Sequence, residues 1–209
     1  MLNSEIIFFT LLAYLTGAFP SAVWLGKRFY SIDVREFGSG NAGATNTFRV
    51  LGKKAGIPVL LMDIFKGWLS VNYINFLSIV PTSVENQFEI QLVFGVAAVI
   101  GHLFPIYTGF RGGKGIATLL GLLIALHFYG ALFSIFIFIL FLAIFRYVSL
   151  ASIIASLTFP IFIILIFNSD NSSLNMFSFF VPLLSLITHQ KNIERLVRGE
   201  ETKIKFGAK

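Results

Sequence analysis

How this chain folds depends on residues 116–145, which read Ile116-Ala-Thr-Leu-Leu-Gly-Leu-Leu-Ile-Ala-Leu-His127-Phe-Tyr-Gly130-Ala-Leu-Phe-Ser-Ile-Phe-Ile-Phe-Ile-Leu-Phe-Leu-Ala-Ile-Phe145. These thirty residues carry no charged side chain. One continuous helix of this length would measure about 45 Å, whereas the hydrocarbon core of a bilayer is about 30 Å thick. We therefore predict two short membrane spans joined near residues 127–130. Two spans also leave the basic C-terminal tail in the cytosol, whereas a single span would place it outside.

The whole chain has the composition of a polytopic membrane protein. Of its 209 residues, 56% are hydrophobic and 12% are charged, and the mean hydropathy is +0.83. We predict an all-α bundle of seven transmembrane helices that forms one domain over residues 1–209, with the N-terminus outside and the C-terminus cytosolic. Besides the two spans within 116–145, the predicted spans are 4–26, 55–79, 90–107, 148–167 and 175–189.

The charge distribution supports this topology. All lysines and arginines fall in predicted cytosolic segments except Lys66, which lies within a span. The net charge of +6 is thereby explained by membrane orientation, so it requires no nucleic acid partner. The chain has no cysteine, which excludes disulfides and thiolate metal sites, and we expect neither a metal nor a cofactor.

The first polar stretch on the cytosolic side is Gly38-Ser39-Gly40-Asn41-Ala42-Gly43-Ala44-Thr45-Asn46, followed by Arg49. Its small residues let the backbone turn tightly and present N–H groups to an anion. Its polar side chains add uncharged donors, and the arginine adds a charged fork. The alternative from composition alone is a flexible glycine-rich loop between helices.

The second polar stretch runs from Gly101-His102 to Gly112-Gly113-Lys114-Gly115. Glycines ahead of a helix expose backbone N–H groups at the positive end of the helix dipole, and a lysine beside them suits phosphate. The alternative is a tight turn whose lysine only follows the positive-inside rule. His102 is either a general base or a hydrogen-bonded structural group.

The third stretch contains His189, Asn192 and Arg195, which share a face if the last helix continues beyond the membrane. The alternative is an ordinary charged tail. Within the second span, Asp63 and Lys66 at i, i+3 predict a structural ion pair. His127 is predicted to lie at an outer turn without a functional role.

Three segments together resemble a known family. They are Gly-Ser-Gly-Asn-Ala-Gly-Ala-Thr-Asn at 38–46, Gly-His-Leu-Phe-Pro with Phe-Arg-Gly-Gly-Lys-Gly at 101–115, and His-Gln-Lys-Asn-Ile-Glu-Arg-Leu with Gly-Glu at 189–200. The family comprises the bacterial integral-membrane (PlsY-like) acyltransferases that use acyl-phosphate to acylate glycerol 3-phosphate. The resemblance covers essentially the whole chain. It implies acyl transfer from a long-chain acyl-phosphate to the 1-hydroxyl of glycerol 3-phosphate, yielding lysophosphatidate and phosphate at the cytosolic face of the bacterial cytoplasmic (inner) membrane.

The resemblance and the residue chemistry together suggest roles for the site residues. Ser39 and Arg49 are expected to bind the phosphate of glycerol 3-phosphate, and Lys114 with the 112–115 backbone to bind that of acyl-phosphate, or the two phosphates exchange these partners. The remaining candidates have supporting roles. Asn41, Thr45 and Asn46 are expected to shape the first loop and contact glycerol. His189 and Asn192 are expected to orient the hydroxyl beside Arg195, while the proton acceptor is His102 or the departing phosphate.

Two other classes of protein remain open at this point. A transporter of a phosphorylated metabolite would also use basic loops and intramembrane charges, but the outer connections carry few polar groups. A membrane anchor would recruit soluble lipid-synthesis enzymes without needing three polar motifs. A soluble enzyme that forms acyl-phosphate is a candidate partner for the tail, and membrane lipids surround the chain.

Overall fold

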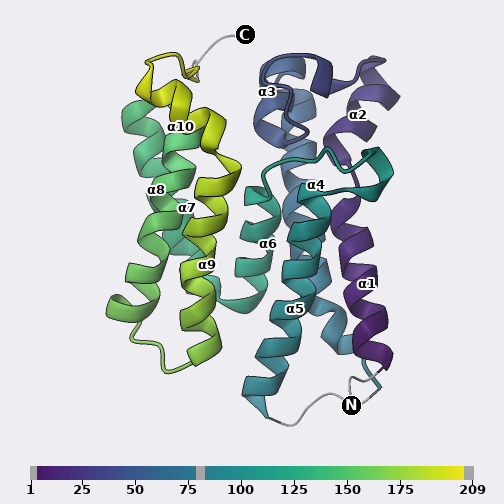
Figure 1. The fold of residues 1–209 in the computed structure, drawn as a ribbon, viewed down its shortest axis with the longest axis vertical. Coiled ribbons are helices and arrows are strands. Elements are labelled where there is room, and N and C mark those ends of the chain that lie inside the picture. The colour runs from purple at the N-terminus through teal and green to yellow at the C-terminus, as the bar shows by residue number, and fades with distance from the viewer. Residues whose placement is uncertain (1–3, 79–82, 205–209) are drawn as a thin grey trace. The chain divides into compact units, whose positions relative to one another are not determined.

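A computed structural model describes residues 4–78 and 83–204, which form helices joined by short connections, and no strand occurs within these two ranges. The chain divides into two compact units, Met1–Leu126 and His127–Lys209, each built of helices (Figure 1). Part of the predicted outer connection 80–89, and Lys205 and Lys209 of the basic tail, lie outside the described residues.

The boundary between the units falls inside the long apolar stretch, as the length argument predicts. Helix α6 (Ile116–Leu126) ends one residue before His127, and α7 (Phe128–Phe145) begins one residue after it. The imidazole Nδ1 of His127 accepts a hydrogen bond from the N–H of Gly130 at 2.9 Å and so caps α7. Its ring also packs edge-on against Phe167. His127 is therefore the residue that caps α7.

The first unit contains six α-helices in its described part. They are α1 (Ser4–Ala18), α2 (Ser21–Tyr30), α3 (Ala44–Leu51), α4 (Lys53–Val71), α5 (Val84–Leu103) and α6, with 3-10 turns η1 (Val34–Glu36), η2 (Asn72–Phe76) and η3 (Ile106–Thr108). The helices α1 and α5 pack closely, as do α4 and α6. A Cβ at Gly121 would collide with the carbonyl of Ile64, so glycine lets α6 approach α4.

The predicted first span, 4–26, is not one straight helix. A bend of 43° separates α1 from α2 at Phe19 and Pro20. Proline has no N–H to donate and its ring clashes with the preceding turn, so the helix breaks there although the apolar composition continues. The break leaves the carbonyl of Phe19 accessible to a side chain from another helix, Lys66.

The second unit consists of α7, α8 (Val148–Ile161), the π-helical turn η4 (Phe162–Ile166), α9 (Ser172–Thr188) and α10 (Gln190–Val197). The condition under which His189, Asn192 and Arg195 would share one helical face is not met, because α9 and α10 meet at His189 with a bend of 65°. His189 and Asn192 are therefore brought together by a corner and not by one helical face.

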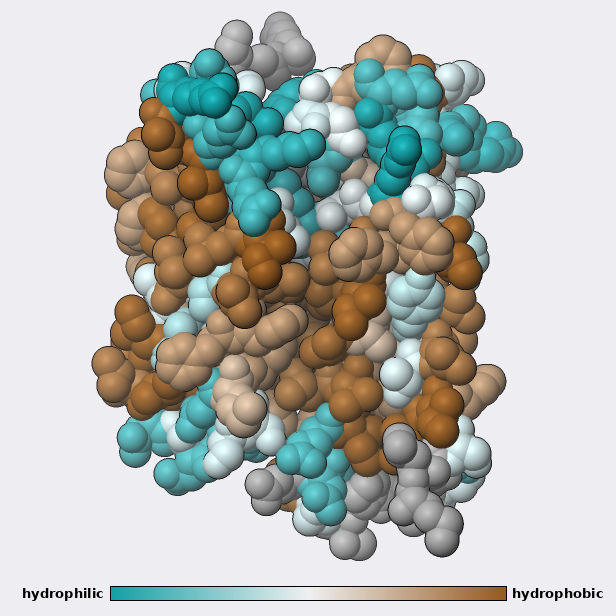
Figure 2. Space-filling model, in the orientation of Figure 1, coloured by the Kyte–Doolittle hydropathy of each residue, from teal (hydrophilic) through white to brown (hydrophobic). Residues whose placement is uncertain are grey.

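Length and composition agree with a membrane protein. Among the described residues, four helical segments are long and apolar enough to cross a bilayer, and up to six are if each bent pair counts as one span. Helix α6 is apolar but has only 11 residues. In Figure 2, hydrophobic side chains cover the middle of the helices and hydrophilic ones gather towards their ends, as expected for segments that face lipid.

Candidate active site

Asn46 organises the loop formed by residues 38–46. Its side chain is 1% exposed, and its Oδ1 accepts hydrogen bonds from the N–H of Ser39 at 2.8 Å and from the Ser39 hydroxyl at 3.1 Å. Its Nδ2 donates to the carbonyls of Val34 at 2.8 Å and Phe37 at 3.1 Å. These bonds engage both amide hydrogens. The geometry supports the predicted loop-shaping role of Asn46 and leaves its amide no donor for glycerol.

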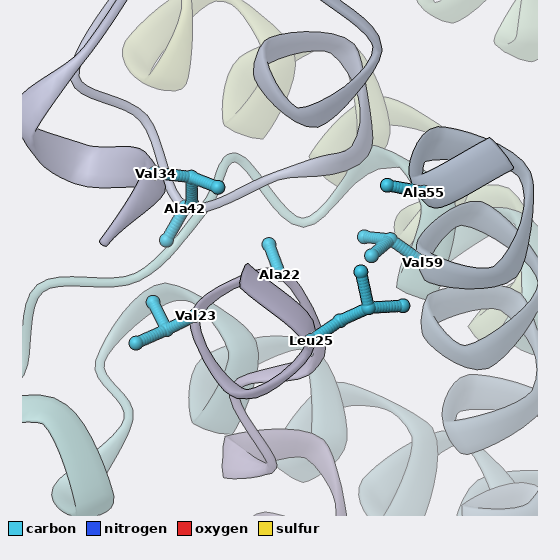
Figure 3. Packing of buried hydrophobic residues seen from close by; sticks show 7 residues of the cluster. All are labelled: Ala22, Val23, Leu25, Val34, Ala42, Ala55 and Val59. Atoms are coloured by element: carbon cyan, nitrogen blue, oxygen red, sulfur yellow. The ribbon is translucent and has the colours of Figure 1, made fainter. Parts of the chain in front are cut away.

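A small hydrophobic core lies beneath this loop (Figure 3). It joins the loop and η1 to α2 and α4 through the buried residues Ala22, Val23, Leu25, Val34, Ala42, Ala55 and Val59. Ala42 lies in the middle of the glycine-rich stretch and is 7% exposed. The loop is thus fixed by burial at Ala42 and by hydrogen bonds at Asn46, so the flexible-loop alternative does not describe it.

The polar groups left at the loop surface are ones predicted to contact phosphate or glycerol. Ser39, Thr45 and Arg49 are exposed, and Asn41 is half-buried. Gly38 has a φ of +62°, which glycine adopts without strain. A Cβ at Gly38 would lie 3.4 Å from Cδ of Arg49, so the arginine stem runs beside the loop next to Ser39.

An arginine outside the predicted set connects this loop to the second stretch. Arg35 donates from Nε and Nη2 to both carboxylate oxygens of Asp33, at 3.0 and 2.7 Å, and from Nη1 to the carbonyl of Thr108 at 3.0 Å. The hydrogen bonds from Arg35 hold the pKa of the Asp33 carboxyl well below its usual range. The sequence pattern did not single out this pair, because it lies before the glycine-rich motif.

His102 and the 112–115 turn are in direct contact, as their shared motif predicts. The carbonyl of His102 accepts the N–H of Gly113 at 3.2 Å. A Cβ at Gly113 would collide with Nε2 of the same histidine, so only glycine permits this packing. His102 is 6% exposed. His102 is therefore packed against the turn, and its role as a general base or as an orienting group stays a prediction.

The predicted ion pair in the second span is present. The ammonium of Lys66 lies 2.8 Å from Oδ1 of Asp63, and both side chains are buried. The sequence did not indicate that His102 also reaches this carboxylate, with Nδ1 at 3.6 Å from Oδ1.

The first and second stretches meet at a surface pocket of about 620 Å³. Gly40 of the first loop and Gly112 of the second turn both line it. The other lining residues are Lys27, Asp33, Arg35, Glu36, Tyr107, Thr108, Gly109 and Arg111. Two glycine-rich stretches that are far apart in sequence therefore each contribute a residue to one pocket of the first unit.

The third stretch lies in the second unit and is organised by a residue that the sequence analysis missed, Glu201. Its Oε1 accepts from Nδ2 of Asn192 at 2.7 Å and from the hydroxyl of Ser149 at 2.8 Å, and its Oε2 accepts from Nε of Arg195 at 2.8 Å. Burial alone would raise the pKa of the Glu201 carboxyl, but these hydrogen bonds outweigh it and lower the pKa. The sequence signal for this arrangement is Gly199, because a glycine after a helix often marks a reversal of the chain. Gly199 adopts a φ of +71° just before Glu201.

His189 is 3% exposed, and its Nδ1 lies 2.9 Å from the carbonyl of Ser185. That carbonyl accepts, so the neutral ring has its proton on Nδ1. Asn192 is held by Glu201 and is 7% exposed. The roles of these residues towards a substrate hydroxyl stay predictions.

The fold and these loops define a class: helical membrane proteins that present glycine-rich polar loops at the ends of apolar helices. Within this class, the chain belongs to the glycerol-3-phosphate acyltransferase family, whose model matches residues 7–199. The chain is 43% identical over 202 residues to glycerol-3-phosphate acyltransferases of Staphylococcus aureus strains Newman and USA300, covering 96% of this chain and 98% of those relatives.

Two solved structures are also similar to the chain. Both are crystal structures of PlsY (YgiH), an integral membrane glycerol 3-phosphate acyltransferase, one in the glycerol 3-phosphate form and one in the lysophosphatidic acid form. The TM-scores are 0.82 and 0.80, at 32% identity and with 97% of this chain and 96% of those chains covered.

Proposed function

We propose that this protein transfers a fatty acyl group from an acyl-phosphate to the 1-hydroxyl of glycerol 3-phosphate, with lysophosphatidate and phosphate as products. Acyl transfer to glycerol 3-phosphate follows from the family and from relatives that cover nearly the whole chain. The structural observation that carries the proposal is the pocket shared by the Gly38–Asn46 loop and the Gly112–Gly115 turn. Two phosphorylated substrates need two such elements.

The choice of donor rests on chemistry and on the resemblance between sequence motifs. Acyl-phosphate is a mixed anhydride with a good leaving group, so no covalent intermediate on the enzyme is required. Acyltransferases that use acyl-CoA carry a His-x4-Asp motif, and no aspartate stands four or five residues after His102, His127 or His189.

The reaction needs positioning and charge neutralisation. The hydroxyl oxygen attacks the carbonyl carbon, and the bond from that carbon to the phosphate oxygen breaks. Ser39 and Arg49 hold the phosphate of glycerol 3-phosphate, and Lys114 with the turn backbone holds the departing phosphate and stabilises its charge. The hydroxyl proton passes to the departing phosphate, so this step needs no base on the enzyme.

We further propose seven membrane crossings, with the N-terminus outside, the C-terminus cytosolic and the site at the cytosolic face of the bacterial inner membrane. Counting each bent helix pair as one crossing gives six, and the short apolar helix α6 supplies the seventh. The positions of the lysines and arginines support the orientation. Cysteines placed singly at Thr45 and Ser173 would test it, since only the cytosolic one should resist an impermeant thiol reagent in whole cells.

An acyl-transfer assay on the purified protein in lipid tests the proposed reaction. Palmitoyl-phosphate and palmitoyl-CoA are offered separately with glycerol 3-phosphate, without added metal. Wild type is compared with Lys114→Ala and with a matched control, Lys54→Ala, in an exposed residue at the start of α4.

We expect lysophosphatidate from palmitoyl-phosphate alone, lost in Lys114→Ala and retained in Lys54→Ala. Product from palmitoyl-CoA alone would overturn the donor and the leaving-group mechanism but keep the acyltransferase. No product from either donor, with the fold intact, would contradict the proposed reaction and favour uptake of glycerol 3-phosphate into vesicles as the activity.

A further inference from the structure

Four polar side chains are buried together among the helices of the first unit. Ser21, Asp63, Lys66 and His102 are 2, 1, 5 and 6% exposed and come from α2, α4 and α5. Oδ1 of Asp63 accepts a hydrogen bond from the Ser21 hydroxyl and lies 2.8 Å from the ammonium of Lys66. Lys66 also donates to the carbonyl of Phe19 at 3.0 Å, at the break between α1 and α2. The carboxylate is therefore fixed from two sides.

This cluster extends further than charge neutralisation requires. Burying an ion in such a unit costs several kcal/mol, and apolar side chains of similar volume are often more stable than a buried ion pair. Here the carboxylate has a third neighbour, because Nδ1 of His102 lies 3.6 Å from Oδ1 of Asp63. Within the described residues, Nδ1 of His102 and Oδ2 of Asp63 are buried without a hydrogen-bond partner. Each residue therefore keeps one buried polar atom with unused hydrogen-bonding capacity, and Nδ1 is the atom of His102 that approaches the carboxylate.

The opposite edge of the imidazole supports the phosphate-binding turn. Nε2 of His102 occupies the space that a Cβ of Gly113 would need, and the carbonyl of His102 accepts the N–H of Gly113. A Cβ at Gly112 would collide with that carbonyl. The turn that carries Lys114 thus rests on both the ring and the backbone of His102, so a rotation of the ring would displace the turn.

We propose that Asp63 is a positioning residue for acyl transfer, which fixes the orientation and tautomer of His102 and thereby the phosphate-binding shape of the 112–115 turn. A carboxylate facing Nδ1 favours the neutral ring with its proton on Nδ1, and Nε2 then presents a lone pair to the turn. Ser21 and Lys66 hold the carboxylate in place. The inference rests on the proposed function, because it concerns the phosphate that the turn binds.

The test compares variants that alter the cluster without leaving an unpaired charge. The double variant Asp63→Asn with Lys66→Gln removes both charges together. Ser21→Ala removes only the hydrogen bond to Asp63, and Ser70→Ala is its matched control, since Ser70 is equally buried but bonds only to the carbonyl of Lys66. For each variant, kcat and KM are measured for both substrates. Direct binding of each substrate to Lys114→Ala, measured without turnover, identifies the substrate whose phosphate lies on the turn.

A second measurement reads the histidine directly. The chain has three histidines, so the imidazole ¹⁵N spectrum of histidine-labelled protein in lipid can be assigned with single substitutions. We expect wild-type His102 to show protonated Nδ1 and the double variant to show a mixture of tautomers. We also expect KM for the substrate weakened in Lys114→Ala to rise about tenfold, by misplacement of the turn. Ser21→Ala should show a smaller rise, and Ser70→Ala none.

Three outcomes would overturn this role for Asp63. They are an unchanged His102 spectrum, a KM that stays at the wild-type value while the tautomer changes, and equal KM changes for both substrates. If the double variant does not fold, Ser21→Ala decides on the same criteria. An inactive wild type would contradict the proposed function instead, and the spectra would still test the contact between Asp63 and His102.

Discussion

Replacing Asn46 by Asp separates the two roles predicted for this residue, shaping the loop and contacting glycerol. An aspartate keeps an acceptor for Ser39 but loses both donors, so the carbonyls of Val34 and Phe37 lose their partners and face a carboxylate. Each buried carbonyl left without a partner costs about 1–3 kcal/mol, which gives a destabilisation on the order of 2–6 kcal/mol for the pair. At a few degrees per kcal/mol, we expect Tm to fall by about 10 °C.

The assay is thermal unfolding in detergent together with KM for glycerol 3-phosphate. Asn72→Asp serves as the control, because Asn72 donates a single hydrogen bond, to the carbonyl of Trp68, outside the site. We expect a large fall in Tm and a raised KM for Asn46→Asp, and little change for Asn72→Asp. A raised KM with an unchanged Tm would refute the loop-shaping argument and assign Asn46 to the substrate.

Three further predictions concern other parts of the chain. Glu201→Gln should destabilise the second unit above pH 5 but not well below it. The lowered pKa of Glu201 gives stability at higher pH, and this stability is lost as the pH falls through the folded-state pKa. Unfolding free energies of both proteins measured against pH test this, and a difference that persists in acid would contradict it. Gly113→Ala should lower kcat/KM strongly by collision with His102. Combining it with His102→Ala should cost less than the sum of the single losses in kcat/KM, and strict additivity would exclude the contact. His127→Ala should lower the free energy of unfolding by about 1 kcal/mol through loss of the α7 cap, whereas His127→Asn can still cap and should keep the wild-type stability. Equal losses for both variants in unfolding assays would argue against capping.

Local features of the fold were predictable because they depend on short-range geometry. The break near His127 followed from the length of the apolar stretch compared with the thickness of a bilayer, and the helices end within a residue of it. The Asp63–Lys66 pair followed from a spacing of i, i+3, which places both side chains on one face of a helix. The bends at Pro20 and His189 were not predicted, since apolar or amphipathic patterns continue across both positions.

The sequence alone determined that the chain is a helical membrane protein with glycine-rich polar loops. Apolar length, charge asymmetry and small-residue motifs act through neighbouring residues, so they can be read along the chain. Only the tertiary structure decided which groups hold those loops: Arg35 reaching Thr108, and His102 standing between Asp63 and Gly113. It also gave Glu201 its three donors. These contacts join residues on different elements. Packing between the elements sets the distances of the contacts, and a local sequence period does not encode that packing.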